Sequence, residues 1–105
     1  MKTLRVTYRE AASADILDVY RWVYAASLDP VTAERFTARL LSACERIGHA
    51  PLGGRPRDDL FPGLRTVAFE KRAVIAYRVE ADTVVLTNVF YGGRDFESLM
   101  RDGGG

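Results

Sequence analysis

Two stretches of the chain have apolar residues three or four positions apart, which is the spacing of an amphipathic helix. The first helix is expected to start at Ser13, whose hydroxyl is a suitable N-cap. The second is expected to start at Asp29-Pro30, an N-cap residue followed by a proline at the first helical position, and Gly48 is placed to end it as a left-handed C-cap. The residues expected to form the buried face of these helices are Ile16, Tyr20, Val23, Phe36, Leu40 and Ile47.

Four shorter stretches, residues 4–8, 64–69, 73–80 and 83–90, read as strands. The links between the last three are so short that these strands must form antiparallel hairpins. Pro62-Gly63 suits a type II turn that would lead into the second strand. The order β-α-α-β-β-β predicts an α+β domain, an antiparallel sheet with a helical hairpin packed on one face.

The length and charge of the chain limit what it can be. A chain of 105 residues forms one domain, with roughly 65% of its unfolded surface buried. We expect that domain over residues 1–100 and a frayed glycine-rich tail over 101–105. Fifteen basic residues nearly cancel 14 acidic ones, so the net charge of +1 predicts no general attraction to nucleic acid. Any functional charge must be local.

Several classes of site lack support in the sequence. Cys44 is the only cysteine, which excludes an intrachain disulfide and is compatible with a reducing cytoplasm. His49 has no cysteine or histidine partner at metal-ligand spacing. No signal peptide, membrane span, nucleotide loop or hydrolase motif is present. We therefore expect a cytoplasmic protein with no metal, no cofactor and no membrane contact.

The arginines Arg65 and Arg78 are the first candidates for a binding surface. Arg78 interrupts an apolar strand, where a charged side chain must reach solvent, a carboxylate or a bound partner. It either pairs with a neighbouring acid on an exposed face or contacts a binding partner. Arg65 lies one strand away and stands on the same face or the opposite one, depending on the strand register.

The segment after the last strand carries further candidates. In Tyr91-Gly92-Gly93-Arg94-Asp95, two glycines follow a strand, which suggests a bulge or the close approach of another chain. Arg94 either forms a local ion pair with Asp95 or is held to contact a phosphate or a carboxylate. Phe96 follows as an aromatic anchor. In the loop before residue 64, arginines and adjacent acids are balanced, which favours a loop pinned by its own ion pairs.

An ordered set of short motifs runs from about Leu4 to Leu99 and resembles a known family. The motifs are Ala14-Asp15-Ile16, Ala33-Glu34-Arg35-Phe36, Gly54-Arg55, Asp59-Leu60, Pro62-Gly63-Leu64-Arg65, Tyr77-Arg78-Val79 and Gly93-Arg94-Asp95. Together they resemble the ParE branch of the ParE/RelE superfamily, the toxins of bacterial type II toxin–antitoxin systems. The resemblance implies the same β-α-α-β-β-β order that the hydrophobic pattern predicts.

The superfamily divides by target. RelE-like members are endoribonucleases that cut mRNA on the ribosome, whereas ParE-like members poison DNA gyrase. Arg65 and Arg94 match basic positions of the RelE-like site, but Ala73 or Val74 stands at a third basic position and no tyrosine follows Phe96. Arginines stabilise charge but hardly accept a proton. The gyrase-poison branch is therefore favoured and catalysis is not, while Tyr91 keeps the nuclease alternative open with Arg65 and Arg94 as its catalytic residues.

The resemblance also implies partners. A cognate ParD-like antitoxin would bind the toxin in a hetero-oligomer, with DNA contacted only through the antitoxin, and DNA gyrase would be the target. The residues expected to contact antitoxin or target are Arg65, Arg78, Tyr91, Arg94 and Phe96. Three outcomes remain open: growth arrest through gyrase, mRNA cleavage on ribosomes, or a toxin fold that only binds its antitoxin.

Overall fold

The computed structural model describes residues 3–92, 97, 99 and 100. Within these residues two long helices, a short 3-10 turn (η1) and five strands follow one another. In chain order they are β1 (Arg5–Tyr8), α1 (Glu10–Ser27), α2 (Pro30–Arg46), η1 (Ile47–His49), β2 (Arg55–Pro56), β3 (Arg65–Phe69), β4 (Ala73–Glu80) and β5 (Thr83–Tyr91).

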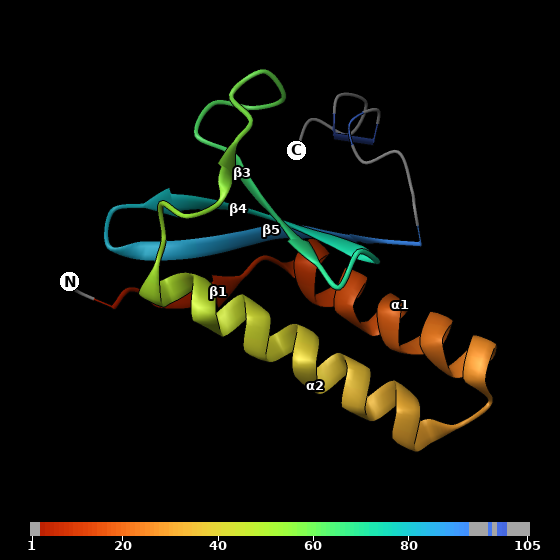
Figure 1. The fold of residues 1–105 in the computed structure, drawn as a ribbon. Coiled ribbons are helices and arrows are strands. Elements are labelled where there is room, and N and C mark those ends of the chain that lie inside the picture. The colour runs from red at the N-terminus through yellow and green to blue at the C-terminus, as the bar shows by residue number, and fades with distance from the viewer. Residues whose placement is uncertain (1–2, 93–96, 98, 101–105) are drawn as a thin grey trace.

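The strands form one sheet in the order β1-β5-β4-β3-β2. All neighbouring pairs are antiparallel except β1 and β5, which run parallel. Figure 1 shows both helices side by side under one face of this sheet, as an antiparallel hairpin. The predicted α+β architecture is confirmed. The sequence did not predict the two-residue edge strand β2, nor which strand β1 would join.

The main core lies between the helical layer and the sheet. Leu40 is completely buried on α2, and Tyr77 and Ile75 are completely buried on β4. The predicted helical face is confirmed, because five of its six residues are buried and Tyr20 packs partly buried against them. Among the described residues, no helix is long and apolar enough to cross a membrane.

A second, smaller cluster lies on the face of the sheet away from the helices. Ala76 and Phe90 alternate along their strands with core residues, so their side chains point away from α1 and α2. The loop between β2 and β3 rises on this side of the sheet (Figure 1). The buried members of the cluster are Leu64, Ala76, Phe90 and Met100, with Leu60 and Phe61 packed against them.

The two helix starts differ in how well the sequence predicts them. Asp29 caps α2 as expected, because its carboxylate accepts the Val31 N–H at 3.1 Å. The expected start of α1 at Ser13 is wrong, since the helix begins at Glu10 without a side-chain cap. The N–H of Arg9 donates to the carbonyl of Leu86 at 3.0 Å, so the chain leaves the sheet directly into the helix.

Gly48 does not end α2 in the left-handed conformation, so that expectation is also wrong. The residue lies inside η1, and its φ is not positive. Its carbonyl instead accepts the N–H of Leu4 at 2.8 Å, and a Cβ at this position would lie 2.4 Å from the Leu4 carbonyl oxygen. Glycine is needed here because η1 packs directly against the backbone that leads into β1.

The turns of the sheet use left-handed residues. Gly63 has φ 79° and the Leu64 N–H donates to Phe61 at 3.0 Å, as the expected turn at Pro62-Gly63 requires. Between β3 and β4, however, Glu70 (φ 49°) and Lys71 (φ 56°) are both left-handed without being glycine. Type I′ turns place asparagine, aspartate or glycine at such positions because a Cβ is strained there.

Lys71→Gly should therefore stabilise the protein. Relief of the left-handed strain, ~1–2 kcal/mol, exceeds the ~0.5–1 kcal/mol that glycine loses in conformational entropy. We expect a gain of up to about 1 kcal/mol in the free energy of unfolding, measured by urea denaturation. Lys71→Ala is the matched control, because it removes the same charge and keeps the Cβ. Equal stability of the two variants would contradict the strain.

Candidate functional site

The Arg65 side chain holds in place the loop that follows η1. Its guanidinium donates to the carbonyls of Leu52 at 3.0 Å and Gly54 at 2.8 Å. Arg65 alternates with Thr66 and shares the orientation of Val67 and Phe69, so it lies on the helix-covered side of the sheet. The site prediction at this position therefore falls on an arginine already engaged with backbone carbonyls, at the end of the sheet near η1.

Tyr77 holds the same loop from the neighbouring strand, where it pairs with Arg65. Its completely buried hydroxyl donates to the Pro51 carbonyl at 2.8 Å and accepts the Gly54 N–H at 2.9 Å. Burial raises the pKa of this phenol, so the proton needed for the bond to Pro51 is retained. Arg65 and Tyr77 together fasten the segment that follows η1 to the sheet.

Arg78 lies on the opposite face. Its guanidinium contacts Glu80 at 2.7 Å and stacks 4.8 Å from the centroid of the Phe61 ring. About a fifth of its side chain is exposed, and its Nε is buried with no hydrogen-bond partner among the residues that the structure describes. The alternative that Arg78 pairs with a neighbouring acid is thus realised. Because Arg65 pairs with Tyr77, the residue next to Arg78, the two arginines stand on opposite faces of the sheet.

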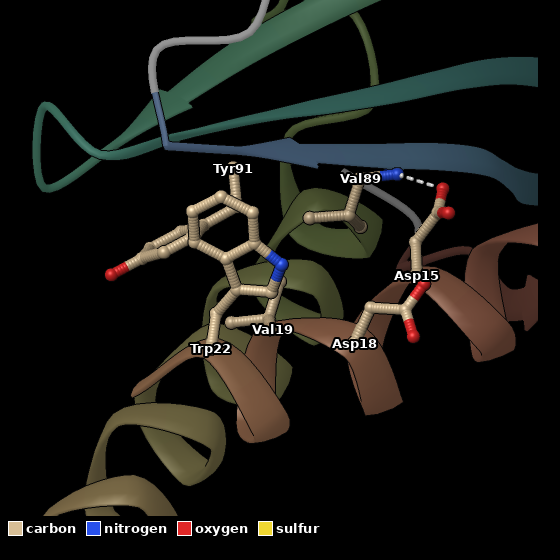
Figure 2. Close-up of a pocket in the computed structure, with 6 residues that line it drawn as sticks. All are labelled: Asp15, Asp18, Val19, Trp22, Val89 and Tyr91. Atoms are coloured by element: carbon tan, nitrogen blue, oxygen red, sulfur yellow. Dashed lines mark hydrogen bonds between the residues drawn. The ribbon is translucent and has the colours of Figure 1, made fainter. Parts of the chain in front are cut away.

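Tyr91 packs beneath the sheet among aromatic side chains. Its ring centroid lies 6.0 Å from Trp22 and 5.7 Å from Phe36, both in edge-to-face geometry. Figure 2 shows the Trp22 and Tyr91 rings packed together between α1 and the end of β5. Trp22 was not singled out from the sequence, although it is 57% exposed and sits where the last strand ends.

A small cavity adjoins these rings (Figure 2), but it is no substrate pocket. Its volume of about 10 Å³ is close to that of one water molecule. Asp15 on its wall accepts the Val89 N–H at 2.9 Å. Because β1 ends at Tyr8, opposite Leu86, no strand in the described part of the chain pairs with this N–H, and the Asp15 carboxylate takes that place. Asp15 therefore stabilises the sheet.

The predicted site residues do not form one group in the described part of the chain. Tyr91 pairs with Ala73, four residues along β4 from the partner of Arg65, Tyr77. At ~3.3 Å per residue, Arg65 and Tyr91 are about 13 Å apart along the strand direction. Arg94 and Phe96 lie outside the described residues.

The basic loop is pinned by ion pairs, as one reading of the sequence expected. Arg57 is 8% exposed and binds Asp59 in bidentate fashion, at 3.0 and 2.8 Å. The same guanidinium also pairs with Glu97. The loop is thereby joined to the helical residues near the C-terminus, where Met100 is buried against the sheet. Sequence reasoning missed this second partner, because nothing local connects Glu97 to residue 57.

The other potentially reactive side chains are held in ordinary structural contacts. Burial raises the pKa of the Cys44 thiol to about 12, so the thiolate needed for nucleophilic attack is absent at neutral pH. Tyr8 donates to Glu45 at 2.5 Å, and burial together with this bond raises its pKa. His49 contacts Thr3 at 3.3 Å. No group of three or more metal-binding side chains occurs among the residues that the structure describes.

Comparison with known proteins gives the family. A family model described as the ParE toxin of the type II toxin–antitoxin system parDE matches residues 6–96. A search of curated protein sequences gives no significant match. A solved structure titled "Chromosomal ParDE TA system from P. aeruginosa" superposes with a TM-score of 0.73 at 18% identity, covering 85% of this chain and 96% of that one. The structural likeness shows a shared fold, and the family match over most of the chain shows that it belongs to the ParE toxin family of type II toxin–antitoxin systems.

Proposed function

We propose that this protein acts as a toxin that inhibits DNA gyrase by binding, and that a ParD-like antitoxin neutralises it. Membership of the ParE family supports the toxin role. Resemblance to the ParE branch, rather than to the RelE-like nucleases, supports gyrase as the target. The proposal implies that the protein works in the cytoplasm, where gyrase and DNA are.

The observation that carries this proposal is the separation of Arg65 from Tyr91. Metal-free cleavage of RNA needs a base, an acid and a charge-stabilising group in one cluster. Here Arg65 binds loop carbonyls at one end of β3, and Tyr91 packs against Trp22 and Phe36 at the other end of the sheet. Inhibition by binding needs no such cluster, because arginine and aromatic anchors supply affinity without chemistry.

One preparation tested in two assays decides between the mechanisms. We expect the purified protein to block supercoiling by gyrase and to accumulate cleaved DNA complexes, and we expect its expression without antitoxin to arrest growth with a DNA-damage response. Ribosomes programmed with mRNA should remain uncut. Codon-positioned mRNA cleavage that is abolished by Tyr91→Phe, with gyrase unaffected, would overturn the proposal in favour of a nuclease.

A substitution and a truncation test which part of the surface is needed for toxicity. We expect Arg94→Ala and truncation after Tyr91 to reduce toxicity, because both remove anchors from the C-terminal segment. Arg21→Ala is the matched control, since Arg21 is an exposed arginine on α1 whose only ion pair in the described structure is with Asp18. Circular dichroism and the urea midpoint of each variant report whether it is folded. Equal toxicity of Arg94→Ala and Arg21→Ala would place the target contact elsewhere.

The antitoxin is expected to bring acidic residues to Arg65, Arg78 or Arg94. Arg65 and Arg78 face opposite sides of the sheet, so a single segment that reached both would have to pass around a sheet edge. Charge reversal at these arginines should weaken the complex.

A further inference from the structure

The exposed side of α2 carries a straight row of positive charge. Arg35, Arg39 and Arg46 are spaced four and seven positions apart, so they share one face of the helix, and all three are exposed. We call these three residues the α2 row. At a rise of ~1.5 Å per residue, the row is about 17 Å long. The residues exposed between its arginines on this face are the small Ala38 and Ser42.

Two arginines of the α2 row are available to an anionic partner. Within the described part of the chain, Arg35 and Arg46 have no carboxylate within salt-bridge distance. The pKa of Asp29 is lowered first by the hydrogen bonds of the α2 cap and last by the charge of Arg35. The neighbours Glu34 and Glu45 are each rotated by ~100° about the helix axis from the adjacent arginine. The row therefore keeps its positive charge.

The turn between β3 and β4 adds two further cations, Lys71 and Arg72, which we call the turn cations. Both are exposed, and neither has a carboxylate within salt-bridge distance among the described residues. Arg39 binds the preceding Glu70 at 2.8 and 3.1 Å, so the turn is held against the exposed side of α2. A groove of about 330 Å³ between the row and the turn is lined by Arg39, Arg46 and Glu70.

Lys71 occupies its position at a conformational cost. Its φ of 56° is left-handed, where glycine or asparagine is the ordinary choice. Strained positions of this kind concentrate at functional sites, where the side chain is needed in spite of the strain. Glycine would relieve the strain but would remove a positive charge from the tip of the turn. A role for the charge of Lys71 accounts for the lysine at this position.

The chemistry of this surface fits the phosphate backbone of duplex DNA. A protein partner is held mainly by aromatic and apolar anchors, but the α2 row exposes only Ala38 and Ser42 between its arginines. A single strand is held by stacking on aromatic rings, but Phe69, the ring in the groove, is 7% exposed. Duplex DNA carries a phosphate every ~3.4 Å along each strand, so a row of about 17 Å faces roughly five phosphates.

We propose that the α2 row and the turn cations bind the phosphate backbone of duplex DNA directly, without reading its sequence. The net charge of +1 is no obstacle, because the contact depends on local charge. The resemblance to the family implies DNA contact only through the antitoxin, so a direct contact goes beyond the proposed function. It would keep the toxin on the DNA that gyrase handles.

The test measures binding of the purified toxin to a fluorescent duplex of about 20 base pairs, by anisotropy between about 0.05 and 0.2 M salt. We expect a dissociation constant in the range of about 10⁻⁴–10⁻⁶ M, as for other non-specific DNA binding. Arg35, Arg46 and the two turn cations make four contacts. The logarithm of the association constant should therefore fall against the logarithm of the salt concentration with a slope of about −3.6.

Single charge removals locate the contact. Arg35→Gln and Arg46→Gln should each weaken duplex binding roughly eightfold at ~0.1 M salt and make the slope shallower by about 0.9. Arg5→Gln is the matched control, because Arg5 is also exposed and also has no carboxylate within salt-bridge distance among the described residues. Arg5 alternates with Leu4 and Val6, which pack on the core, so it lies on the face away from the helices. Its removal should leave binding unchanged.

Variants of Lys71 separate binding from folding. Lys71→Gly is expected to stabilise the protein, yet it should weaken duplex binding by a similar factor, because one phosphate contact is lost. Lys71→Arg keeps the charge and should bind as the wild type does. A weaker contact in a more stable variant cannot come from unfolding.

Contrary outcomes are distinct. No binding to the duplex below about 10⁻⁴ M would overturn the proposal, and so would an equal loss for Arg5→Gln and Arg46→Gln, which would assign binding to net charge. Tighter binding of a single strand of the same length would assign the surface to a different nucleic acid. Equal affinity for a polyglutamate peptide would assign it to an acidic protein segment. The assay contains neither gyrase nor antitoxin, so each of these results leaves the toxin proposal standing.

Discussion

Gly54→Ala is expected to destabilise the protein by roughly 2–4 kcal/mol, a large loss for a methyl group added in a loop. The new Cβ would lie 2.4 Å from the Tyr77 hydroxyl oxygen, 2.8 Å from its Cε1 and 2.9 Å from its Cζ. Tyr77 is completely buried, so it cannot move away without losing its bonds to Pro51 and Gly54. Thermal and urea unfolding measure the loss.

The neighbouring glycine provides the control for this prediction. Gly53→Ala adds the same methyl group one residue earlier, at an exposed position where the nearest atom is the Ala50 carbonyl oxygen at 3.2 Å. It should cost much less. Tyr77→Phe combined with Gly54→Ala should cost less than the sum of the single changes, because the closest clashing atom is gone. Equal losses for Gly53→Ala and Gly54→Ala would mean that the contact with Tyr77 does not select glycine.

Leu40→Ala is expected to lower the free energy of unfolding by ~2–5 kcal/mol, against a typical total of ~5–15 kcal/mol. Leu40 is 0% exposed at the centre of the helix–sheet core, so its removal leaves a cavity that neighbouring side chains fill only in part. Denaturation by urea is the measurement, and a reduced midpoint with an unchanged slope would assign the effect to stability.

Leu41→Ala is the matched control for Leu40→Ala. It makes the same substitution in the same helix, so it changes helix propensity equally. Leu41 is 39% exposed, and we expect its truncation to cost much less. Similar losses at the two positions would contradict the packing of α2 on the sheet.

Much of the fold followed from local patterns in the sequence. The spacing of Ile16, Phe36 and Leu40 gave the two helices, and the Asp29-Pro30 pair gave the start of α2. The pairing of β1 with β5 could not be predicted in this way, because it joins segments more than 70 residues apart. The start of α1 was missed for a similar reason. It depends on the bond from Arg9 to Leu86 in a distant strand rather than on Ser13.

The candidate site was harder to predict than the fold. A shift of one residue in strand register exchanges the two faces of a strand, and the link from Glu70 to Arg72 allows more than one register. Whether Arg65 and Arg78 share a face was therefore open until the pairing of Arg65 with Tyr77 was known. The partners of Arg65, the carbonyls of Leu52 and Gly54, carry no side-chain signal. These two partners of Arg65 could therefore not be predicted from the sequence.

The bonds between Tyr77 and the Pro51–Gly54 segment also bear on how the molecule opens. Surface loops are usually the parts of a protein that unfold locally and that proteases cut first. The amide of Gly54 is instead bonded to a side chain at the centre of the sheet. Its hydrogen should therefore exchange as slowly as those of the core, although it lies in a loop. The connection between the helical layer and the sheet is then released only when the whole domain unfolds, and this loop offers proteases no early point of attack.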